Sequence, residues 1–435
     1  MTFLYIVLSL FGLACTYNIY YPQSKHAGLG IASFVFGVLW GELAIFLLPL
    51  QMVGMVLFIL CGVVQGFWMK LLLLLTLLSW LAQLVYIVNA VRSADLLRAA
   101  LDSAGIARFG ADGKLLEQSL DAVTATVNTN NAETDYWRRV RKPFSIRLDN
   151  VACQKGIIYK HVDGQSQALD IYHDRNLANL NQAPVLLYIH GGGLLEKGGT
   201  RMGQGLPLLN ELASRGWVCV SIDYRLSPRN RWPAHIIDCK SALAWIKDNI
   251  EQYGGNPDFV MTAGDSAGGQ LSALMALTAN HPDYQQDHPE LDSRIQGAIC
   301  FYGVMDFCNL YGTSLNDDAA ALWAEQVMGA DLQDPDYKAF FQSASAIAQA
   351  ESHNQPATIP DCLLIHGTHD SLVDVRESRL LAEKLGQVSD NKVIYADVPQ
   401  AQHAFNVFRS LRSERVLQQV CRFAESIHRE YSQSV

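Results

Sequence analysis

The stretch Gly264-Asp265-Ser266-Ala267-Gly268 decides the fold of this chain of 435 residues. A short apolar run at 259–262 comes directly before it and a helical pattern at 270–277 follows it, so the backbone has to turn from a strand into a helix within a few residues. Glycines two positions before and after Ser266 remove side chains that would collide across so sharp a turn. The pattern predicts a turn that exposes the Ser266 hydroxyl beside a helix N-terminus, where unpaired N–H groups favour negative charge. A small-residue turn without chemistry is the less favoured interpretation.

Short apolar runs and helical patterns alternate on both sides of this turn. Continuous apolar runs are typical of strands that are buried on both faces of a sheet. Runs that predict strands lie at 157–159, 168–172, 185–189, 217–222, 259–262, 295–301, 362–365 and 392–396, and helical patterns lie at 236–251 and 270–277. This alternation predicts an α/β fold, a mostly parallel sheet flanked by helices, in a catalytic domain at 140–435.

A second motif, His190-Gly191-Gly192-Gly193, follows directly after the predicted strand at 185–189. A loop without side chains lets a substrate carbonyl approach backbone N–H groups, which stabilise the negative oxygen that forms during nucleophilic attack. We expect the N–H groups of Gly191, Gly192 and Ala267 to form this oxyanion hole, in which one donor lowers the barrier by about 3 kcal/mol. A flexible loop at the end of a strand is the alternative for the glycines, and His190 is interpreted as a residue that braces the loop.

Two residues that would complete a catalytic triad follow the last two predicted strands. Asp370 comes after the strand at 362–365, and His403 comes after the strand at 392–396. The order Ser266, Asp370, His403 is the order of nucleophile, acid and base in α/β-hydrolases. In this arrangement the histidine takes the serine proton, and the aspartate holds the histidine in the productive tautomer.

Neighbouring residues offer alternatives to this assignment. Asp374 lies in the same loop as Asp370 and is an alternative acid, whereas His428 lies in a helical run and is a weaker alternative base. His366 and His369 lie close to Asp370 in the sequence, but no further cluster of metal ligands accompanies them, and a metal site would leave the serine turn unexplained. We therefore expect neither a metal nor a cofactor.

Taken together, the motifs resemble the hormone-sensitive-lipase-like branch of the α/β-hydrolases, and in particular the membrane-associated carboxylesterases of the mycobacterial type. The resemblance covers about residues 140–430 and rests on stretches at 190–193, 223–228, 232–235, 253–257, 264–269, 301–304 and 401–405. It implies hydrolysis of carboxylic esters, usually with short to medium acyl chains, by the triad and the oxyanion hole named above. Asp374 is a departure, because such proteins often carry a proline at that place.

Apolar residues close to these motifs are expected to bind the substrate. They are Leu194, Leu195, Leu372, Val373 and Phe405. The insertion between about 305 and 350 is expected to form a cap over the site, with apolar residues Leu322, Trp323, Phe340 and Phe341. Ordinary core packing is an equally good interpretation for the cap aromatics.

The first 92 residues have the composition of a transmembrane helical region. Between 28 and 91 the only formal charges are Glu42 and Lys70, and about 20 apolar residues suffice for a helix to cross the hydrocarbon layer. Apolar stretches lie at 3–20, 30–49, 51–66 and 68–91, with predicted breaks at Pro49, Gln51 and Gln65. Because the stretch at 51–66 is short enough to be re-entrant, the sequence predicts three crossings, with four as the alternative. No positive segment precedes the first stretch, which we interpret as an uncleaved span.

Flanking charges suggest an orientation in the membrane. With three crossings, Lys25 and Arg92 fall on one side, which the positive-inside rule assigns to the cytoplasm together with the catalytic domain. Glu42 lies near the middle of an apolar stretch without a partner at matching depth, and we interpret it as a structural carboxyl. Residues 93–139 are predicted to be a linker with two amphipathic helices, near 96–104 and 115–127, at the membrane surface or on the catalytic domain.

The overall charge and the cysteines restrict the partners. A net charge of −9 argues against a nucleic-acid partner. The basic run at 138–142 is interpreted as a surface turn, with contact to anionic lipid headgroups as the alternative. Nine cysteines without a C-x-x-C pair indicate free thiols in a reducing compartment. The expected partners are a membrane and a small-molecule or lipid-like ester, and the sequence does not indicate the oligomeric state.

The sequence thus predicts a membrane-anchored serine hydrolase that cleaves carboxylic esters through an acyl-enzyme on Ser266. An amidase or arylformamidase, or an acyltransferase, would use the same triad and is the alternative. A binding protein built on an inactive hydrolase fold is disfavoured because no triad member is missing. A transport role for the N-terminal region is disfavoured because no paired charges lie inside its apolar stretches.

Overall fold

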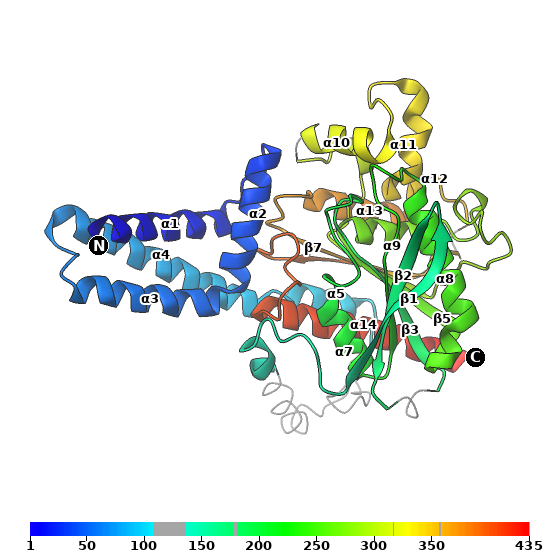
Figure 1. Cartoon of the computed structure of the whole chain (residues 1–435), viewed down its shortest axis with the longest axis horizontal. Coiled ribbons are helices and arrows are strands. Elements are labelled where there is room, and N and C mark those ends of the chain that lie inside the picture. Colours follow the sequence, from blue (N-terminus) through cyan, green and yellow to red (C-terminus); the bar gives the residue numbers. More distant parts are fainter. Residues whose placement is uncertain (108–135, 177–180, 316, 356–357, 435) are drawn as a thin grey trace.

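A bundle of helices from the first 92 residues projects from a larger body, in which helices cover both faces of a sheet (Figure 1). The computed structural model describes residues 1–107, 136–176, 181–315, 317–355 and 358–434. The larger body is the α/β architecture that the alternation of apolar runs and helical patterns predicts.

Eight strands form one sheet in the described part of the chain, in the order β1-β2-β4-β3-β5-β6-β7-β8. Their bounds are β1 Val151–Val162, β2 Gln165–Asp174, β3 Ala183–Ile189, β4 Val218–Ile222, β5 Gly255–Asp265, β6 Gly297–Phe301, β7 Asp361–Gly367 and β8 Val393–Val398. β2 pairs antiparallel with β1 and β4, and all pairs from β4 to β8 are parallel. The motifs of the site follow β3, β5, β7 and β8, so they meet at the edge formed by the carboxyl ends of parallel strands.

Alternate side chains of the central strands point into two separate cores. In β3, Val185 and Leu187 belong to one core, and Leu186 and Tyr188 belong to the other. The first core is covered by α8 (Ala234–Asn249), α9 (Ala267–Leu277), α11 (Lys338–Ala344), α12 (Ala346–Ser352) and α13 (Val375–Val388). The second is covered by α5 (Asp95–Ser103), α7 (Leu206–Ser214) and α14 (Leu411–Ser434). Burial on both faces explains the continuous apolar runs of these strands.

Helix α5 comes from the segment that the sequence assigns to a linker. Its Leu97 and Leu101 are fully buried against the sheet body, whereas Leu96 is 52% exposed. The helix is therefore part of the second core of the α/β body. The second amphipathic pattern, near 115–127, lies outside the described residues.

The N-terminal region forms four helices, α1 (Thr2–Tyr20), α2 (Ala27–Glu42), α3 (Ala44–Leu60) and α4 (Gly66–Arg92). Helices α1, α3 and α4 run side by side, whereas α2 lies across the end of the bundle against the α/β body (Figure 1). The chain bends by 84° between α2 and α3. The predicted breaks at Pro49 and Gln51 are wrong, because both residues lie inside α3, and the bend falls at Leu43. Contacts with the α/β body hold α2 in its own direction up to Glu42, so the chain turns there.

Two helices, α1 and the one that begins at Gly66, are long and apolar enough to cross a membrane, and the bent pair α2–α3 could supply a third crossing. Polar side chains join the helices inside the bundle, where Gln83 Nε2 and Ser79 Oγ donate to Thr16 Oγ1 at 2.9 and 2.8 Å. Such bonds are a usual way for helices to associate in an apolar surrounding.

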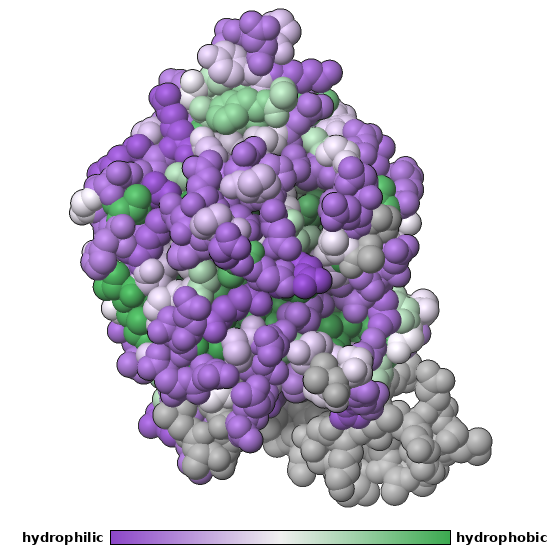
Figure 2. Space-filling view, turned by 90° about the vertical axis from the view of Figure 1, so that its right-hand side faces the viewer, coloured by the Kyte–Doolittle hydropathy of each residue, from purple (hydrophilic) through white to green (hydrophobic). Residues whose placement is uncertain are grey.

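Apolar side chains are distributed unevenly over the surface. The face of the α/β body that lies farthest from the bundle is largely hydrophilic, with scattered apolar patches (Figure 2). Most of the exposed large apolar side chains lie instead between Met1 and Val88. A large exposed apolar surface on a monomer marks a contact with a membrane or another protein.

Candidate active site

Ser266 lies at the turn between the end of β5 and the start of α9, with φ of 55° and ψ of −123°. A non-glycine residue in this region carries a strain of about 1–3 kcal/mol. The turn is tight, because a Cβ on Gly264 would lie 2.2 Å from the carbonyl oxygen of Gly268, and a Cβ on Gly268 would lie 2.0 Å from that of Ile189. A side chain at either glycine would therefore clash with neighbouring backbone atoms. The N–H of Ser266 donates to Phe301 O at 2.9 Å and ties the turn to β6.

Asp370 and His403 meet at the ends of β7 and β8. His403 Nδ1 lies 2.6 Å from Asp370 Oδ2, and Asp370 Oδ1 accepts hydrogen bonds from the N–H groups of Leu372 and Val373. Burial alone would raise the pKa of Asp370, but His403 and the neighbouring His366 outweigh it and hold this pKa well below its usual range. An ionised carboxylate at this position orients the imidazole and stabilises its protonated form.

The alternative acid and base have other partners. Asp374 caps the N-terminus of α13, where it accepts a hydrogen bond from the N–H of Arg376 at 2.8 Å. The His428 ring lies on α14 and packs against Phe259, with 4.9 Å between the ring centroids. Of the four candidates, Asp370 and His403 are the two that the structure brings together.

Ser266 and His403 line one cavity of about 560 Å³. Among the described residues, the hydroxyl of Ser266 makes no hydrogen bond to the imidazole. Hydrogen bonds of this kind often tighten only in the complex with substrate. The ring of Tyr302 packs against His403, with 4.6 Å between centroids, and holds the imidazole at the cavity wall.

A polar cluster lies behind Ser266. Asp265 Oδ1 accepts a hydrogen bond from Asn406 Nδ2 at 3.2 Å, and Asn406 also bonds to the Tyr302 hydroxyl. Burial raises the pKa of Asp265. Asn406 joins the end of β5 to the loop that carries His403. This residue was missed from the sequence, because no local sequence pattern indicates that it contacts β5.

One predicted oxyanion donor is wrong. The N–H of Gly191 donates to Gln204 Oε1 at 2.7 Å, so it does not point a free donor into the cavity. Gly192 and Gly193 both line the cavity. In the part of the chain that the structure describes, the N–H groups of Gly192, Gly193 and Ala267 make no hydrogen bond.

The predicted substrate-binding residues divide into two groups. Leu195, Leu372 and Val373 line the cavity. The predictions for Leu194 and Phe405 are wrong, because both side chains are fully buried in the cores. Leu194 has a φ of 63°, and this left-handed turn after Gly193 directs its side chain inward and leaves Leu195 at the cavity.

The cap insertion contributes two of its four predicted residues. Leu322 and Trp323, at the end of α10 (Asp317–Trp323), line the cavity. Phe341 is buried in the first core and Phe340 packs against that core. For these two aromatics the core-packing interpretation is therefore correct.

Helix α2 supplies cavity residues that sequence reasoning missed. Gly30, Ile31, Phe34 and Val38 all line the cavity, and the Phe34 ring meets the edge of the His403 ring with 5.9 Å between centroids. Apolar residues of this kind are equally suited to lipid and to a protein pocket. A sequence signal for this contact was available, because Gly30, Gly37 and Gly41 lie on one face of the helix, and a face of small residues favours close packing against another part of the protein.

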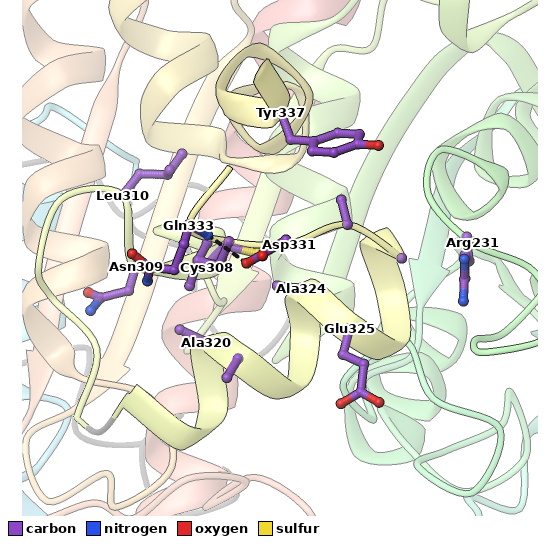
Figure 3. A pocket seen from close by; sticks show the side chains of 14 residues that line it. Arg231, Cys308, Asn309, Leu310, Ala320, Ala324, Glu325, Asp331, Gln333 and Tyr337 are labelled. Carbon is purple, nitrogen blue, oxygen red and sulfur yellow. Dashed lines mark hydrogen bonds between the residues drawn. The ribbon is translucent and has the colours of Figure 1, made fainter. Parts of the chain in front are cut away.

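A larger hollow of about 1100 Å³ lies within the cap insertion and is lined by Cys308, Glu325, Asp331 and Tyr337 among others, with Arg231 from outside the insertion (Figure 3). Asp331 Oδ1 accepts a hydrogen bond from the N–H of Gln333 at 2.9 Å. The hollow contains none of Ser266, Asp370 and His403, and the described residues hold no group of three metal-ligating side chains. The smaller cavity is thus the one that contains the reactive groups.

Comparisons with known proteins agree with this geometry. The BD-FAE family model matches residues 169–385. The probable carboxylic ester hydrolase LipM of Mycobacterium tuberculosis is 33% identical over 97% of this chain and 93% of its own length. Esterase LipC of the same organism is 35% identical over 62% of this chain and 65% of its own. Native Thermogutta terrifontis esterase 2 shares the fold, with a TM-score of 0.51 at 23% identity over 67% of this chain and 96% of its own. The chain therefore belongs to the hormone-sensitive-lipase-like family of α/β-hydrolases, and it is a carboxylic ester hydrolase.

Proposed function

We propose that this hydrolase is anchored in a membrane by its N-terminal helices and cleaves esters through an acyl-enzyme on Ser266. The observation that carries the proposal is the pairing of His403 Nδ1 with Asp370 Oδ2 at 2.6 Å, in a cavity whose wall includes the strained Ser266 turn. A nucleophile, a base and an orienting acid are the three parts that acyl transfer at neutral pH requires.

The reaction proceeds in two halves. His403 Nε2 takes the Ser266 proton as the oxygen attacks the ester carbonyl, and the N–H groups of Gly192, Gly193 and Ala267 receive the negative oxygen. The protonated imidazole then gives its proton to the leaving alcohol, which leaves the acyl group on Ser266. A water molecule repeats the sequence and releases the carboxylic acid.

The proposed membrane anchor rests on the surface and length of the N-terminal helices. Their outward side chains are mostly large and apolar, and the 27 residues of α4 extend about 40 Å, more than the hydrocarbon thickness. With three crossings, made by α1, by the α3 part of the bent pair α2–α3 and by α4, Met1 and the α/β body lie on opposite sides of the membrane. Lys25 and Arg92 lie on the side of the body and Lys70 lies at the other end, so the positive-inside rule favours a body in the cytoplasm.

The test uses purified full-length protein in detergent with p-nitrophenyl esters, the matching anilides and a fluorophosphonate probe. We expect ester turnover and labelling in the wild type, and loss of both in Ser266→Ala. Ester turnover that persists in Ser266→Ala would contradict the assignment. A higher kcat/KM for anilides than for esters would instead identify an amidase that uses the same triad.

The anchor is tested separately by membrane fractionation. We expect the full chain to remain with membranes after a carbonate wash and to be released by detergent. Recovery in the wash would contradict the anchor and leave the proposed chemistry untouched.

A further inference from the structure

One face of α2 lies directly on the loops that carry the acid and the base. Positions 30, 33, 37, 38 and 41 of this helix are buried, whereas positions 28, 29, 32, 35 and 36 are exposed. Residues three and four apart share a face of a helix, so the buried positions form one continuous stripe. Gly30 and Gly37 of this stripe meet Ser371 and Gln402 of the α/β body, whereas Ser33 bonds to Asn18 and Gly41 meets Tyr86 of the bundle. Figure 1 shows α2 lying between the bundle and the body.

Small residues on this stripe allow close approach. A Cβ on Gly30 would lie 3.1 Å from the carbonyl oxygen of Ser371, next to the acid, and a Cβ on Gly37 would lie 3.2 Å from Gln402 Nε2, next to the base. The carbonyl of Gly30 accepts a hydrogen bond from Ser371 Oγ at 3.1 Å. The helix backbone is therefore seated on both catalytic loops, and Phe34, between the two glycines, reaches the His403 ring.

Further polar contacts fix α2 and the end of the preceding helix α1 on the body. His369 Nδ1 lies 2.9 Å from the carbonyl oxygen of Ile19, near the end of α1, the helix that precedes α2. At the end of α2, Glu42 pairs with Arg412 and accepts a hydrogen bond from Ser410 Oγ at 2.5 Å. Helix α2 is thus tied to the body at Gly30 and at Glu42 by groups that are buried or partly buried, so the cavity wall it forms is a built part of the site.

We propose that α2 is the acyl-binding wall of this enzyme, and that Phe34 and Val38 determine which acyl chains it accepts. The proposal rests on the proposed function, since the pocket is an acyl pocket only if Ser266 is the nucleophile. Phe34 and Val38 line the cavity together with the apolar residues Leu195, Leu322 and Trp323. A cavity of about 560 Å³ with these walls is in the usual size range for a medium-sized apolar ligand.

The direction of α2 also indicates where such chains come from. The helix bends by 84° from α3, so it lies nearly in the plane of the membrane if α3 crosses it. Leu29, Val35 and Phe36 on its outer face are exposed, as expected of a helix that lies in the interface. The favoured substrates are therefore esters whose acyl chains partition into a bilayer.

The test measures acyl-chain selectivity in the full-length protein in detergent. We compare kcat/KM for p-nitrophenyl decanoate and acetate in wild type, Val38→Trp and the matched control Val35→Trp, whose position is 41% exposed and lies on the outer face. An indole at position 38 would displace two or more methylene groups of the longer chain, so we expect the decanoate-to-acetate ratio to fall about tenfold. The control should stay within about twofold of wild type, as surface substitutions usually do.

A second variant and a labelling control keep the outcomes distinct. Phe34→Ala widens the cavity beside His403, and we expect its decanoate-to-acetate ratio to change at least about threefold, the equivalent of one methylene contact. Fluorophosphonate labelling of Ser266 reports that each variant is folded. Labelled variants at both positions with the wild-type ratio would overturn the proposal, whereas turnover in Ser266→Ala would overturn the proposed function instead.

Discussion

Removal of the Glu42 carboxylate should loosen the attachment of the N-terminal helices to the α/β body. Glu42 is 4% exposed and Arg412 is fully buried, and the two side chains form an ion pair. Arg412 Nη1 also donates to the Tyr86 hydroxyl at 3.1 Å, but its Nε and Nη2 have no partner among the described residues. Glu42→Gln therefore leaves a buried guanidinium without a counter-charge, which costs about 3–5 kcal/mol.

The measurement is chemical or thermal unfolding of the full-length protein in detergent, with activity as a second probe. Asp292→Asn is the matched control, because Asp292 pairs with Arg294 on the surface, where the two side chains are 48% and 61% exposed, and such pairs contribute at most about 1 kcal/mol. The double variant Glu42→Gln with Arg412→Met should recover most of the loss, since no unpaired charge remains. A loss for Glu42→Gln no larger than that for Asp292→Asn would refute the reasoning.

Four further predictions concern Asp370 and two glycines. Asp370→Asn should lower kcat about 10⁴-fold while the protein remains folded. Steady-state kinetics measures the first effect and circular dichroism the second. Because the pKa of Asp370 is lowered in the fold, its ionised form stabilises the protein above pH about 4, and this contribution is lost as the pH falls through the lowered pKa; unfolding curves of Asp370→Asn should lack that part of the acid dependence. Gly268→Ala should abolish folding or activity, since its Cβ would lie 2.0 Å from Ile189 O. Gly386→Ala, in a helix with open space, should instead stabilise by about 0.5–1 kcal/mol; equal melting temperatures for the two variants would contradict this.

The N-terminal helices do more in this structure than their composition indicates. Their apolar outer surface fits a membrane anchor, but α2 also lines the cavity that contains Ser266 and His403. The match to LipM extends over 97% of the chain and so includes this region. Anchor and catalytic body are therefore best studied as one unit, and truncation of the first helices would remove a wall of the site.

The sequence by itself determined the features whose requirements lie in adjacent residues. A strand buried on both faces needs a continuous apolar run, so β3 to β7 are visible as such runs. A strained turn from strand to helix needs glycines at fixed distances, which Gly264 and Gly268 supply. The ends of β7 and β8 are likewise marked by Asp370 and His403, so the sheet and the pairing of acid and base were predictable.

Only the tertiary structure decided which groups face the cavity and which groups pair across the chain. Leu194 and Leu195 are adjacent and chemically identical, and a left-handed φ of 63° buries the first and leaves the second at the cavity. Glu42 has no partner nearby in the sequence, because Arg412 lies 370 residues further on. Apolar residues of α2 satisfy lipid and protein equally well, so hydropathy cannot say that Phe34 lies against His403. Contacts between segments far apart in the chain have no local signature, since each side chain is compatible with several surroundings until the fold supplies one.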